Sequence, residues 1–303
     1  MGQSRAAVWK NIRKLQADFG LTVHAVRGRG YRLAAPLELL DSARIHGRLD
    51  AASKDALEAL HLLSSAASTN SCALSDLPAK SGTARVWVAE HQTAGRGRRG
   101  RTWVSSYGAN LYLSLAWRFD LPMAELTGLS LAAGVVVAEA LQHLGVERHV
   151  LKWPNDIMVD GCKLSGILVD VSGEAGGPAT AVIGVGVNVR MPIEHGVQIE
   201  QPWTDLSRIS AVPISRNDLA GIIVDRLIGA CRLFAEQRLA PFLGRWERFD
   251  KLHGEDVLLI RGDRVICGVY RGISPSGAML LENAGGLSEH FAGEVSLRMV
   301  ANA

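Results

Sequence analysis

A glycine- and arginine-rich loop between two predicted strands constrains the fold of this chain more than any other segment. Four arginines and three glycines fill its seven positions 95–101, and we call this segment the arginine loop. Residues 85–89 have the composition of a β-strand, and residues 110–117 alternate polar and apolar side chains as a half-buried strand does. A sheet is therefore expected to hold both ends of the loop. Glycines allow close approach of backbone N–H groups and arginines add positive charge, so the loop suits a phosphate or carboxylate. The alternatives are a disordered basic loop and a nucleic-acid patch.

Composition places the chain among soluble globular proteins of two or three domains, with 303 residues, 48% hydrophobic and 21% charged. The four cysteines lack any C-x-x-C pair and are expected to be reduced thiols of a cytoplasmic protein; they are Cys72, Cys162, Cys231 and Cys267. No secretory signal is visible at the N-terminus. The longest uncharged apolar stretch, Leu126–Ala138, is shorter than the roughly 20 residues of a membrane span.

Positive charge is concentrated at the N-terminus. Residues 1–35 carry seven basic side chains against one acidic side chain, a net charge of +6, whereas the whole chain carries +3. The remainder is therefore mildly acidic, at −3. A basic module attached to an acidic body indicates nucleic acid as a partner of the module only.

The first residues predict a helix followed by a basic hairpin. Ser4 precedes apolar residues at helical spacing, Gly20 follows as a stop, and short β runs at 21–26 and 31–33 flank Gly28-Arg29-Gly30. This pattern is typical of the recognition helix and wing of a winged helix-turn-helix. The basic side chains offered to DNA are Arg5, Lys10, Arg27 and Arg29. The alternative is a small α+β unit with a solvated charged face. The helices expected before Ser4 are absent, so the module is expected to be truncated, and operator binding depends on whether Met1 is the native start.

After a connector at Pro36, helices are expected over Asp41–Leu49 and Lys54–Leu63. Ser68-Thr69-Asn70 stands at a predicted helix start, where it is either a helix cap or a set of small hydrogen-bonding side chains. Residues 125–144 have the length and apolarity of a core helix.

Further along, strands are predicted to bring charged residues together. The pair Asp160-Gly161 between two β-type runs predicts a hairpin that places Lys152, Asp156 and Lys163 at neighbouring strand ends. A strand over 180–189 contains Gly184 and Gly186, which indicates close approach by a ligand or backbone.

The last third of the chain predicts a lid, a helix and a small barrel. Residues 191–208 are expected to be a loop that carries Trp203 onto a ligand. An amphipathic helix is expected over 216–239, and short β runs over 251–303 fit a small barrel.

Arginines, two lysines and one aspartate suit chemistry on a nucleoside triphosphate. If a carboxylate attacks the α-phosphorus of ATP, arginine, lysine and Mg²⁺ stabilise the charge that develops, and Asp156 can hold the metal or its waters. The chain has neither a G-x-x-x-x-G-K-[ST] phosphate loop nor a dinucleotide glycine motif after a strand, which argues against kinase-like and Rossmann mechanisms.

Five sequence blocks, in the order in which they occur, resemble those of the biotin protein ligases. The resemblance is greatest to the bifunctional bacterial members that also repress the biotin operon. The blocks are Gln92–Arg101, Gly108–Tyr112, Lys152–Asp156, Lys163–Leu168 and Gly184–Asn188. The resemblance runs from Ser4 to Arg298. It implies an α+β fold with a partial winged helix-turn-helix at 1–36. A catalytic domain of the biotin/lipoate ligase (class II synthetase-like) type with a central mixed β-sheet is implied at 37–250, and a small SH3-like β-barrel at 251–303.

The resemblance also implies a reaction and a site. Biotin and MgATP give biotinyl-5′-adenylate and pyrophosphate, and a lysine of the biotin carboxyl carrier protein of acetyl-CoA carboxylase then takes the biotinyl group. The implied catalytic residues are Arg98, Lys163 and Asp156, the last with Mg²⁺. The implied biotin contacts are Ser68, Thr69, Asn70, Gln92, Gly95, Arg96, Gly97, Arg98, Lys163 and Gly166. The implied nucleotide contacts are Arg98, Arg101, Lys152, Asn155, Asn188, Trp203 and Arg298.

Repressing family members bind operator DNA and form homodimers when loaded with adenylate, so the resemblance implies a monomer–homodimer equilibrium. Three other functions are weighed against the ligase. They are a DNA-binding regulator with little ligase activity, a lipoate-type ligase, and a nonspecific RNA-binding protein that uses the arginine loop.

Overall fold

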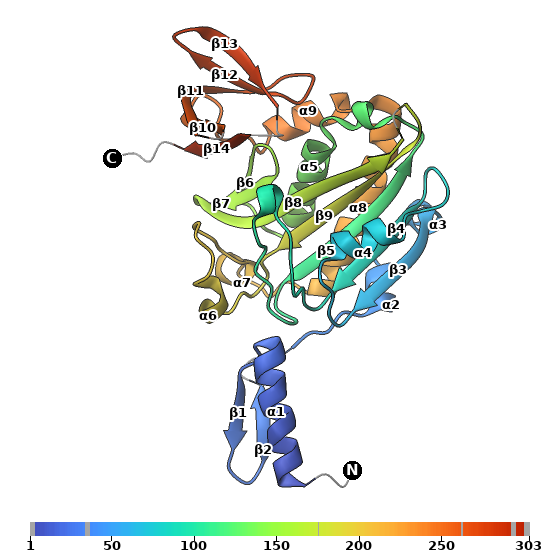
Figure 1. The fold of residues 1–303 in the computed structure, drawn as a ribbon, viewed down its shortest axis with the longest axis vertical. Coiled ribbons are helices and arrows are strands. Elements are labelled where there is room, and N and C mark those ends of the chain that lie inside the picture. Colours follow the sequence, from blue (N-terminus) through green and yellow to red (C-terminus); the bar gives the residue numbers. More distant parts are fainter. Residues whose placement is uncertain (1–3, 34–36, 175, 262, 292–294, 300–303) are drawn as a thin grey trace.

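A computed structural model describes residues 4–33, 37–174, 176–261, 263–291 and 295–299, the last range as backbone only. Its strands form separate sheets of two, seven and five strands. Figure 1 shows the two-stranded N-terminal unit at one end of the molecule, the seven-stranded sheet in the middle and the five-stranded sheet at the other end. The α+β class predicted from the sequence is confirmed.

The N-terminal unit consists of α1 (Arg5–Phe19) and an antiparallel hairpin of β1 (Val23–Val26) and β2 (Gly30–Leu33). The Ser4 hydroxyl accepts a hydrogen bond from the N–H of Ala7 at 3.2 Å, and Gly20 ends the helix with a φ of 64°. No side chain of α1 is buried. The predicted helix and hairpin are confirmed, whereas a complete winged helix-turn-helix is not seen in the described residues.

The seven-stranded sheet has the order β3 (Leu57–Leu63), β4 (Ala84–Ala89), β5 (Leu111–Phe119), β9 (Ala179–Val187), β8 (Cys162–Gly173), β7 (Asp156–Val159) and β6 (His149–Lys152). β3 is parallel to β4 and the other neighbours are antiparallel, so the sheet is mixed, as predicted. β5 is buried along almost its whole length. The prediction of a half-buried strand at 110–117 is therefore wrong, because a central strand covered on both faces has no solvated side.

Residues 57–63 correct a second prediction. A helix over 54–63 is wrong, because α3 (Ala51–Ala56) ends at Ala56 and the chain continues as β3 in register with β4. The Asp50 carboxylate caps α3 by accepting a hydrogen bond from the Ser53 N–H at 2.6 Å. Leucine is compatible with both helix and strand, so the hydrogen bonds offered by β4 decide the structure of this run.

Helices cover both faces of the seven-stranded sheet. On one face lie α5 (Leu129–His143), α8 (Arg216–Gln237) and α9 (Ala240–Glu247), which enclose the main core, and α4 (Thr69–Ser75) packs on the other face. The short helix α2 (Ser42–His46) packs against α8. Residues 123–143 could cross a membrane by length and composition, but 67% of that window is buried inside the protein. The prediction of a core helix in this region is confirmed.

Short helices and turns complete the central unit. They are η1 (Arg98–Gly100), η2 (Met123–Leu126), α6 (Ile193–Gly196) and α7 (Leu206–Ile209). The last two lie inside the segment predicted to be an irregular loop. Asp160 and Gly161 have φ values of 48° and 77° and join β7 to β8, as the Asp-Gly pair predicts.

The C-terminal sheet is open. Its strand order is β13 (Gly286–His290), β12 (Met279–Asn283), β11 (Arg264–Ile273), β10 (Asp256–Arg261) and β14 (Val295–Met299). β13 and β14 are the two edges and are not paired with each other in the described residues, whereas a closed barrel requires that pairing. The short β runs are confirmed, but the sheet differs from the predicted barrel. The Trp153 indole N–H donates to the Gly277 carbonyl at 3.3 Å and links this sheet to the central unit.

All four cysteines are free thiols, as predicted. Burial raises the pKa of the Cys231 thiol well above its ordinary value, so this side chain behaves as a small apolar group of the core.

Candidate functional site

Small residues line the face of the central sheet that α4 covers. Ser114 of β5 lies beside Gly184 of β9, and Gly186 follows on the same face. A Cβ atom on Gly184 would lie 2.1 Å from Asn70 Oδ1, and one on Gly186 would lie 2.6 Å from the Trp103 ring. The two glycines therefore leave the space that the Asn70 and Trp103 side chains occupy. This is the close approach that glycines in a strand indicate.

Four polar side chains form a buried network over this face, which we call the pocket network: Thr69, Asn70, Gln92 and Ser114. Thr69 donates to Gln92 Oε1 from its backbone N–H at 2.8 Å and from its hydroxyl at 3.1 Å. The Ser114 hydroxyl lies 2.7 Å from Thr69 Oγ1 and 2.5 Å from Asn70 Oδ1. A serine hydroxyl has one proton, so it satisfies one of these acceptors at a time and leaves the other able to accept from a ligand.

Ser68 is buried at the N-cap position of α4, but its side chain makes no capping hydrogen bond. The predicted helix start at Ser68 is confirmed, but its side chain does not cap the helix. Thr69 and Asn70, which the resemblance implies as biotin contacts, belong to the pocket network.

The arginine loop folds back on itself over the sheet. The Gly97 N–H donates to the Arg101 carbonyl at 2.7 Å, and the Trp103 N–H donates to the Gly95 carbonyl at 2.9 Å. A Cβ atom on Gly95 would lie 2.5 Å from the Trp103 carbonyl oxygen, so a larger residue would force this turn open. The loop, together with β8, lines a cavity of about 620 Å³.

Three charged side chains lie near one another beside Trp103, and we call them the ionic cluster: Arg98, Asp156 and Lys163. Lys163 Nζ is 2.7 Å from Asp156 Oδ1, and both side chains are largely buried. The Arg98 guanidinium donates to Asn155 Oδ1 at 3.4 Å. Burial lowers the pKa of Arg98, and the negative charge of Asp156 opposes that shift. Such a cluster stabilises negative charge that develops on a carboxylate or phosphate.

Strand register explains how distant sequence positions meet here. Lys152 is the backbone partner of Asp156 across β6 and β7, and Asp156 is the partner of Gly166 on β8. A Cβ atom on Gly166 would lie 3.0 Å from the Trp103 ring and 3.3 Å from Lys163 Nζ. The Trp103 ring therefore lies next to Gly166 and Gly186 of the sheet and next to Lys163 of the ionic cluster.

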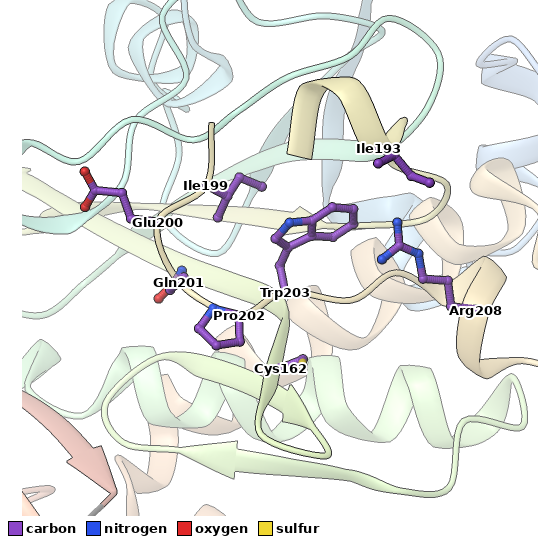
Figure 2. Close-up of a pocket in the computed structure, with 8 residues that line it drawn as sticks. All are labelled: Cys162, Ile193, Ile199, Glu200, Gln201, Pro202, Trp203 and Arg208. Atoms are coloured by element: carbon purple, nitrogen blue, oxygen red, sulfur yellow. The ribbon is translucent and has the colours of Figure 1, made fainter. Parts of the chain in front are cut away.

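A second cavity, of about 560 Å³, lies beside the hairpin of β7 and β8 (Figure 2). Trp203 is in its wall, where the Arg208 guanidinium lies 4.2 Å from the indole centroid. The Trp203 indole N–H donates to the Gly196 carbonyl at 3.1 Å, and the backbone of Trp203 forms a bridge with Lys163. The segment predicted to cover a ligand is thus attached directly to the ionic cluster.

Asn188 follows β9 and connects β8 with the segment that carries Trp203, and its backbone N–H donates to the Leu164 carbonyl at 3.0 Å. Its Nδ2 donates to the Thr204 carbonyl at 3.0 Å, whereas its Oδ1 is buried without a hydrogen-bond partner among the described residues. An unsatisfied buried acceptor is costly, so a ligand donor at this position would be favoured.

Arg101 is exposed on the loop and lines the cavity of about 620 Å³. Arg298 is in β14, and its side chain is outside the described part of the chain. The four predicted DNA contacts are exposed on the N-terminal unit, which Figure 1 shows at the end of the molecule away from the five-stranded sheet; they are Arg5, Lys10, Arg27 and Arg29.

Three residues of the site are absent from the prediction: Trp103, Ser114 and Asp170. Trp103 ends the loop in sequence, and its buried ring N–H has no hydrogen-bond partner among the described residues. Ser114 and Asp170 are polar residues inside strands, at positions that face α4 and the loop. A polar residue on the buried side of a predicted strand is the one signal that could have indicated them.

The central unit matches a family model described as the biotin/lipoate A/B protein ligase family over residues 63–188. The bifunctional ligase/repressor BirA of Escherichia coli is 42% identical over 299 residues, which are 98% of this chain and 90% of that protein. The chain belongs to the biotin/lipoate A/B protein ligase family.

Two further relatives are named as biotin ligases. The biotin--[acetyl-CoA-carboxylase] ligase of Mycobacterium tuberculosis is 33% identical over 69% of this chain and 77% of its own length. A biotin protein ligase from Aquifex aeolicus, solved in complex with biotin and ATP, is 31% identical with a TM-score of 0.65, covering 80% of this chain and 99% of that chain.

Proposed function

We infer that the protein is a biotin protein ligase. It activates biotin with ATP to biotinyl-5′-adenylate, with release of pyrophosphate, and transfers the biotinyl group to a lysine of a biotin carboxyl carrier protein. One observation carries this conclusion: the Trp103 ring packs against Gly186, on the sheet face that carries the pocket network, and lies 5.5 Å from Lys163 Nζ of the ionic cluster, in a chain 42% identical to a protein named bifunctional ligase/repressor BirA. The pocket network suits the polar but uncharged end of a ligand, and the ionic cluster suits a carboxylate at the other end of the same ligand.

Biotin has an apolar body, a ureido group at one end and a carboxylate at the other. The pocket network supplies acceptors and donors for the ureido group, with Ser68 beside it. The Trp103 ring occupies the space over Gly166 and Gly186, so the apolar bicycle of biotin would bind there after the ring moves aside and would then pack against its aromatic surface. Arg96 and Gly97 belong to the loop over the same cavity.

In the first step, the biotin carboxylate attacks the α-phosphorus of ATP, the bond to the β-phosphate oxygen breaks, and pyrophosphate leaves. Lys163 and Arg98 lie where they stabilise the attacking carboxylate and the crowded phosphate. Lys152, Asn155 and Asn188 border this region and are proposed nucleotide contacts. Mg²⁺ bound to ATP would supply charge that neutralises the phosphates. A single carboxylate is enough to hold it, because Mg²⁺ takes one or two carboxylates with phosphates and waters, and Asp156 would be that carboxylate.

In the second step, the ε-amine of the carrier lysine attacks the carbonyl carbon of the mixed anhydride, and AMP leaves. The chain needs no nucleophile of its own, because the adenylate is already activated. The amine gives up a proton in this step, which passes to solvent.

The reactive anhydride must be protected from water. The arginine loop and the segment with Trp203 border the two cavities, and we propose that both close over the adenylate. Arg101 at the edge of the loop and Arg298 in β14 are proposed contacts at the ATP and carrier-protein side.

We also propose that the N-terminal unit binds operator DNA as part of a winged helix-turn-helix, and that repression involves a homodimer. The E. coli relative is named a ligase/repressor, and the unit exposes Arg5 and Lys10 on its helix and Arg27 and Arg29 on its hairpin turn. We further propose domain limits at 1–36, 37–250 and 251–303, with a barrel-like C-terminal domain. The proposed location is cytoplasmic.

The proposed function is tested by mass spectrometry of a biotin carrier domain incubated with the protein, biotin and MgATP. A mass increase of one biotinyl group on one lysine is expected. Lipoate in place of biotin is the matched control. Modification with lipoate alone would reassign the enzyme as a lipoate ligase, and no modification with either acid would refute the ligase.

DNA binding has a separate test. Affinity for an inverted-repeat operator should fall steeply with salt and rise with biotin and ATP. Operator binding in the absence of any carrier modification would favour a regulator over an enzyme, and tight single-strand RNA binding indifferent to biotin would favour an RNA-binding protein.

A further inference from the structure

Asp170 lies at the border between the pocket network and the arginine loop. It is on β8 and faces the same side of the sheet as Leu168, two residues earlier. Its carboxylate accepts a hydrogen bond from Asn70 Nδ2 at 3.0 Å through one oxygen, and its other oxygen lies 3.4 Å from Arg96 Nη2. One side chain thus contacts the pocket and the loop at the same time.

The contact with Asn70 fixes the orientation of that amide. A carboxylate only accepts hydrogen bonds, so it must face the NH₂ group of Asn70. The same NH₂ group lies 3.3 Å from the Leu168 carbonyl oxygen, a second acceptor. Two acceptors on one side turn Asn70 Oδ1 toward Ser114 and the pocket. If the amide rotated, a donor would replace the acceptor that the pocket presents.

The contact with Arg96 fixes the first half of the loop. Arg98, two residues later, contacts Asn155, which directly precedes β7. The loop is therefore held at two points, by Asp170 of β8 and by Asn155. The Asp170 side chain is 24% exposed and that of Arg96 is 44% exposed, so this ion pair is partly hydrated and can open and close. A partly exposed pair suits a loop that must release its product.

We propose that Asp170 is a positioning residue that couples the floor of the biotin pocket to the loop that covers it. This inference rests on the proposed ligase function. Its carboxylate orients Asn70 for the ureido group and holds Arg96 over the cavity, so that filling the pocket and closing the loop are a single event. Asp170 takes no part in bond making, and its effect appears in substrate binding and in retention of the adenylate.

The test compares Asp170→Asn, Asp170→Glu and the control Ser172→Ala, an exposed residue on the same strand face. In Asp170→Asn, the KM for biotin in adenylate formation should rise roughly tenfold and the adenylate should dissociate roughly tenfold faster, as expected for loss of a charge-assisted contact. The kcat should stay within about twofold, because the ionic cluster is untouched. Asp170→Glu, which keeps the charge, should restore most of the wild-type KM.

Two further measurements separate positioning from folding. Adding Arg96→Gln to Asp170→Asn should cost little more than Asp170→Asn alone, since Asp170→Asn already removes the charged partner of Arg96. Trypsin should cut the unliganded Asp170→Asn protein faster than wild type within 96–101, because Arg96 is released. This cleavage rate requires no enzymatic activity.

Each outcome decides something. The proposal is overturned if Asp170→Asn has the same kinetic constants and the same trypsin cleavage rate as Ser172→Ala. It is also overturned if Asp170→Asn lowers both kcat and the melting temperature and Asp170→Glu does not restore them. If the wild-type protein forms no adenylate with biotin, the ligase assignment fails. The link between Asp170 and the loop would then be decided by the cleavage rate alone.

Discussion

Gly184 offers a quantitative test of the site, because its missing side chain makes room for Asn70. An alanine methyl group at this position would lie 2.1 Å from Asn70 Oδ1 and 2.9 Å from Asn70 Cγ. Asn70 would have to move away and give up the hydrogen bond that its Oδ1 accepts from Ser114 at 2.5 Å. Overpacking in a tight interior costs about 1–3 kcal/mol, and a lost buried hydrogen bond adds about 1 kcal/mol.

Gly184→Ala is therefore expected to lower the free energy of unfolding by about 2–4 kcal/mol, which corresponds to a drop in melting temperature of roughly 5–10 °C. The expected change is measured by differential scanning calorimetry, with the KM for biotin determined in parallel and expected to rise. The matched control is Gly229→Ala on the exposed side of α8, where an added Cβ meets nothing within 4 Å. Alanine in a helix interior should stabilise the protein there by about 0.5–1 kcal/mol.

The reasoning is refuted if Gly184→Ala melts at or above the wild-type temperature. It is also refuted if combining Gly184→Ala with Asn70→Ala is as destabilising as the sum of the two single changes. Truncating Asn70 removes the atoms that clash, so the destabilisation caused by the methyl group should shrink in that background.

Three other predictions follow from the charged and titratable groups. Lys163→Ala should lower kcat for pyrophosphate exchange by about 100-fold or more, because Asp156 and the reacting carboxylate then lie side by side without the cation 2.7 Å away; an unchanged kcat would remove Lys163 from the first step. Arg216→Met should cost about 3–5 kcal/mol in urea unfolding, since it leaves Glu90, only 6% exposed, without its partner at 2.7 Å; a loss below about 1 kcal/mol would contradict this. Burial lowers the pKa of His149 below its ordinary 6.5, so the unfolded chain binds this proton more readily than the folded protein does. The free energy of unfolding should therefore decrease as pH falls below about 6.5, and this part of the decrease should disappear in His149→Gln. Identical pH profiles of the two proteins would rule out the burial effect.

Several features of the site could be read from the sequence because they depend on local chemistry. The Asp160-Gly161 turn fixes a two-residue hairpin whatever surrounds it, and this hairpin places Asp156 and Lys163 on adjacent strands. The glycines at 184 and 186 indicated close approach, which the structure confirms with the Asn70 and Trp103 side chains. The family resemblance is likewise carried by short blocks whose order along the chain is visible without a structure.

Other features depend on partners that are distant in sequence. Residues 57–63 satisfy both helical and extended patterns, and only the neighbouring strand β4 makes them a strand. The strand at 110–117 alternates as a half-exposed strand would, yet the helices on one side and α4 on the other bury both faces. Whether the C-terminal strands close into a barrel depends on the pairing of its edges, which no local pattern specifies.

The sequence by itself determined the turns, the basic loop and the inventory of charged and hydrogen-bonding groups, because these follow from backbone preferences and side-chain chemistry over a few residues. The tertiary structure alone decided which of those groups meet. Asp170 is an ordinary acidic residue in the sequence, and it becomes the contact between Asn70 and Arg96 only because strand register and the fold of the loop bring positions 70, 96 and 170 to one point. Hydrogen bonds and ion pairs act over about 3 Å, so their partners are fixed by the folded chain and not by distance along it.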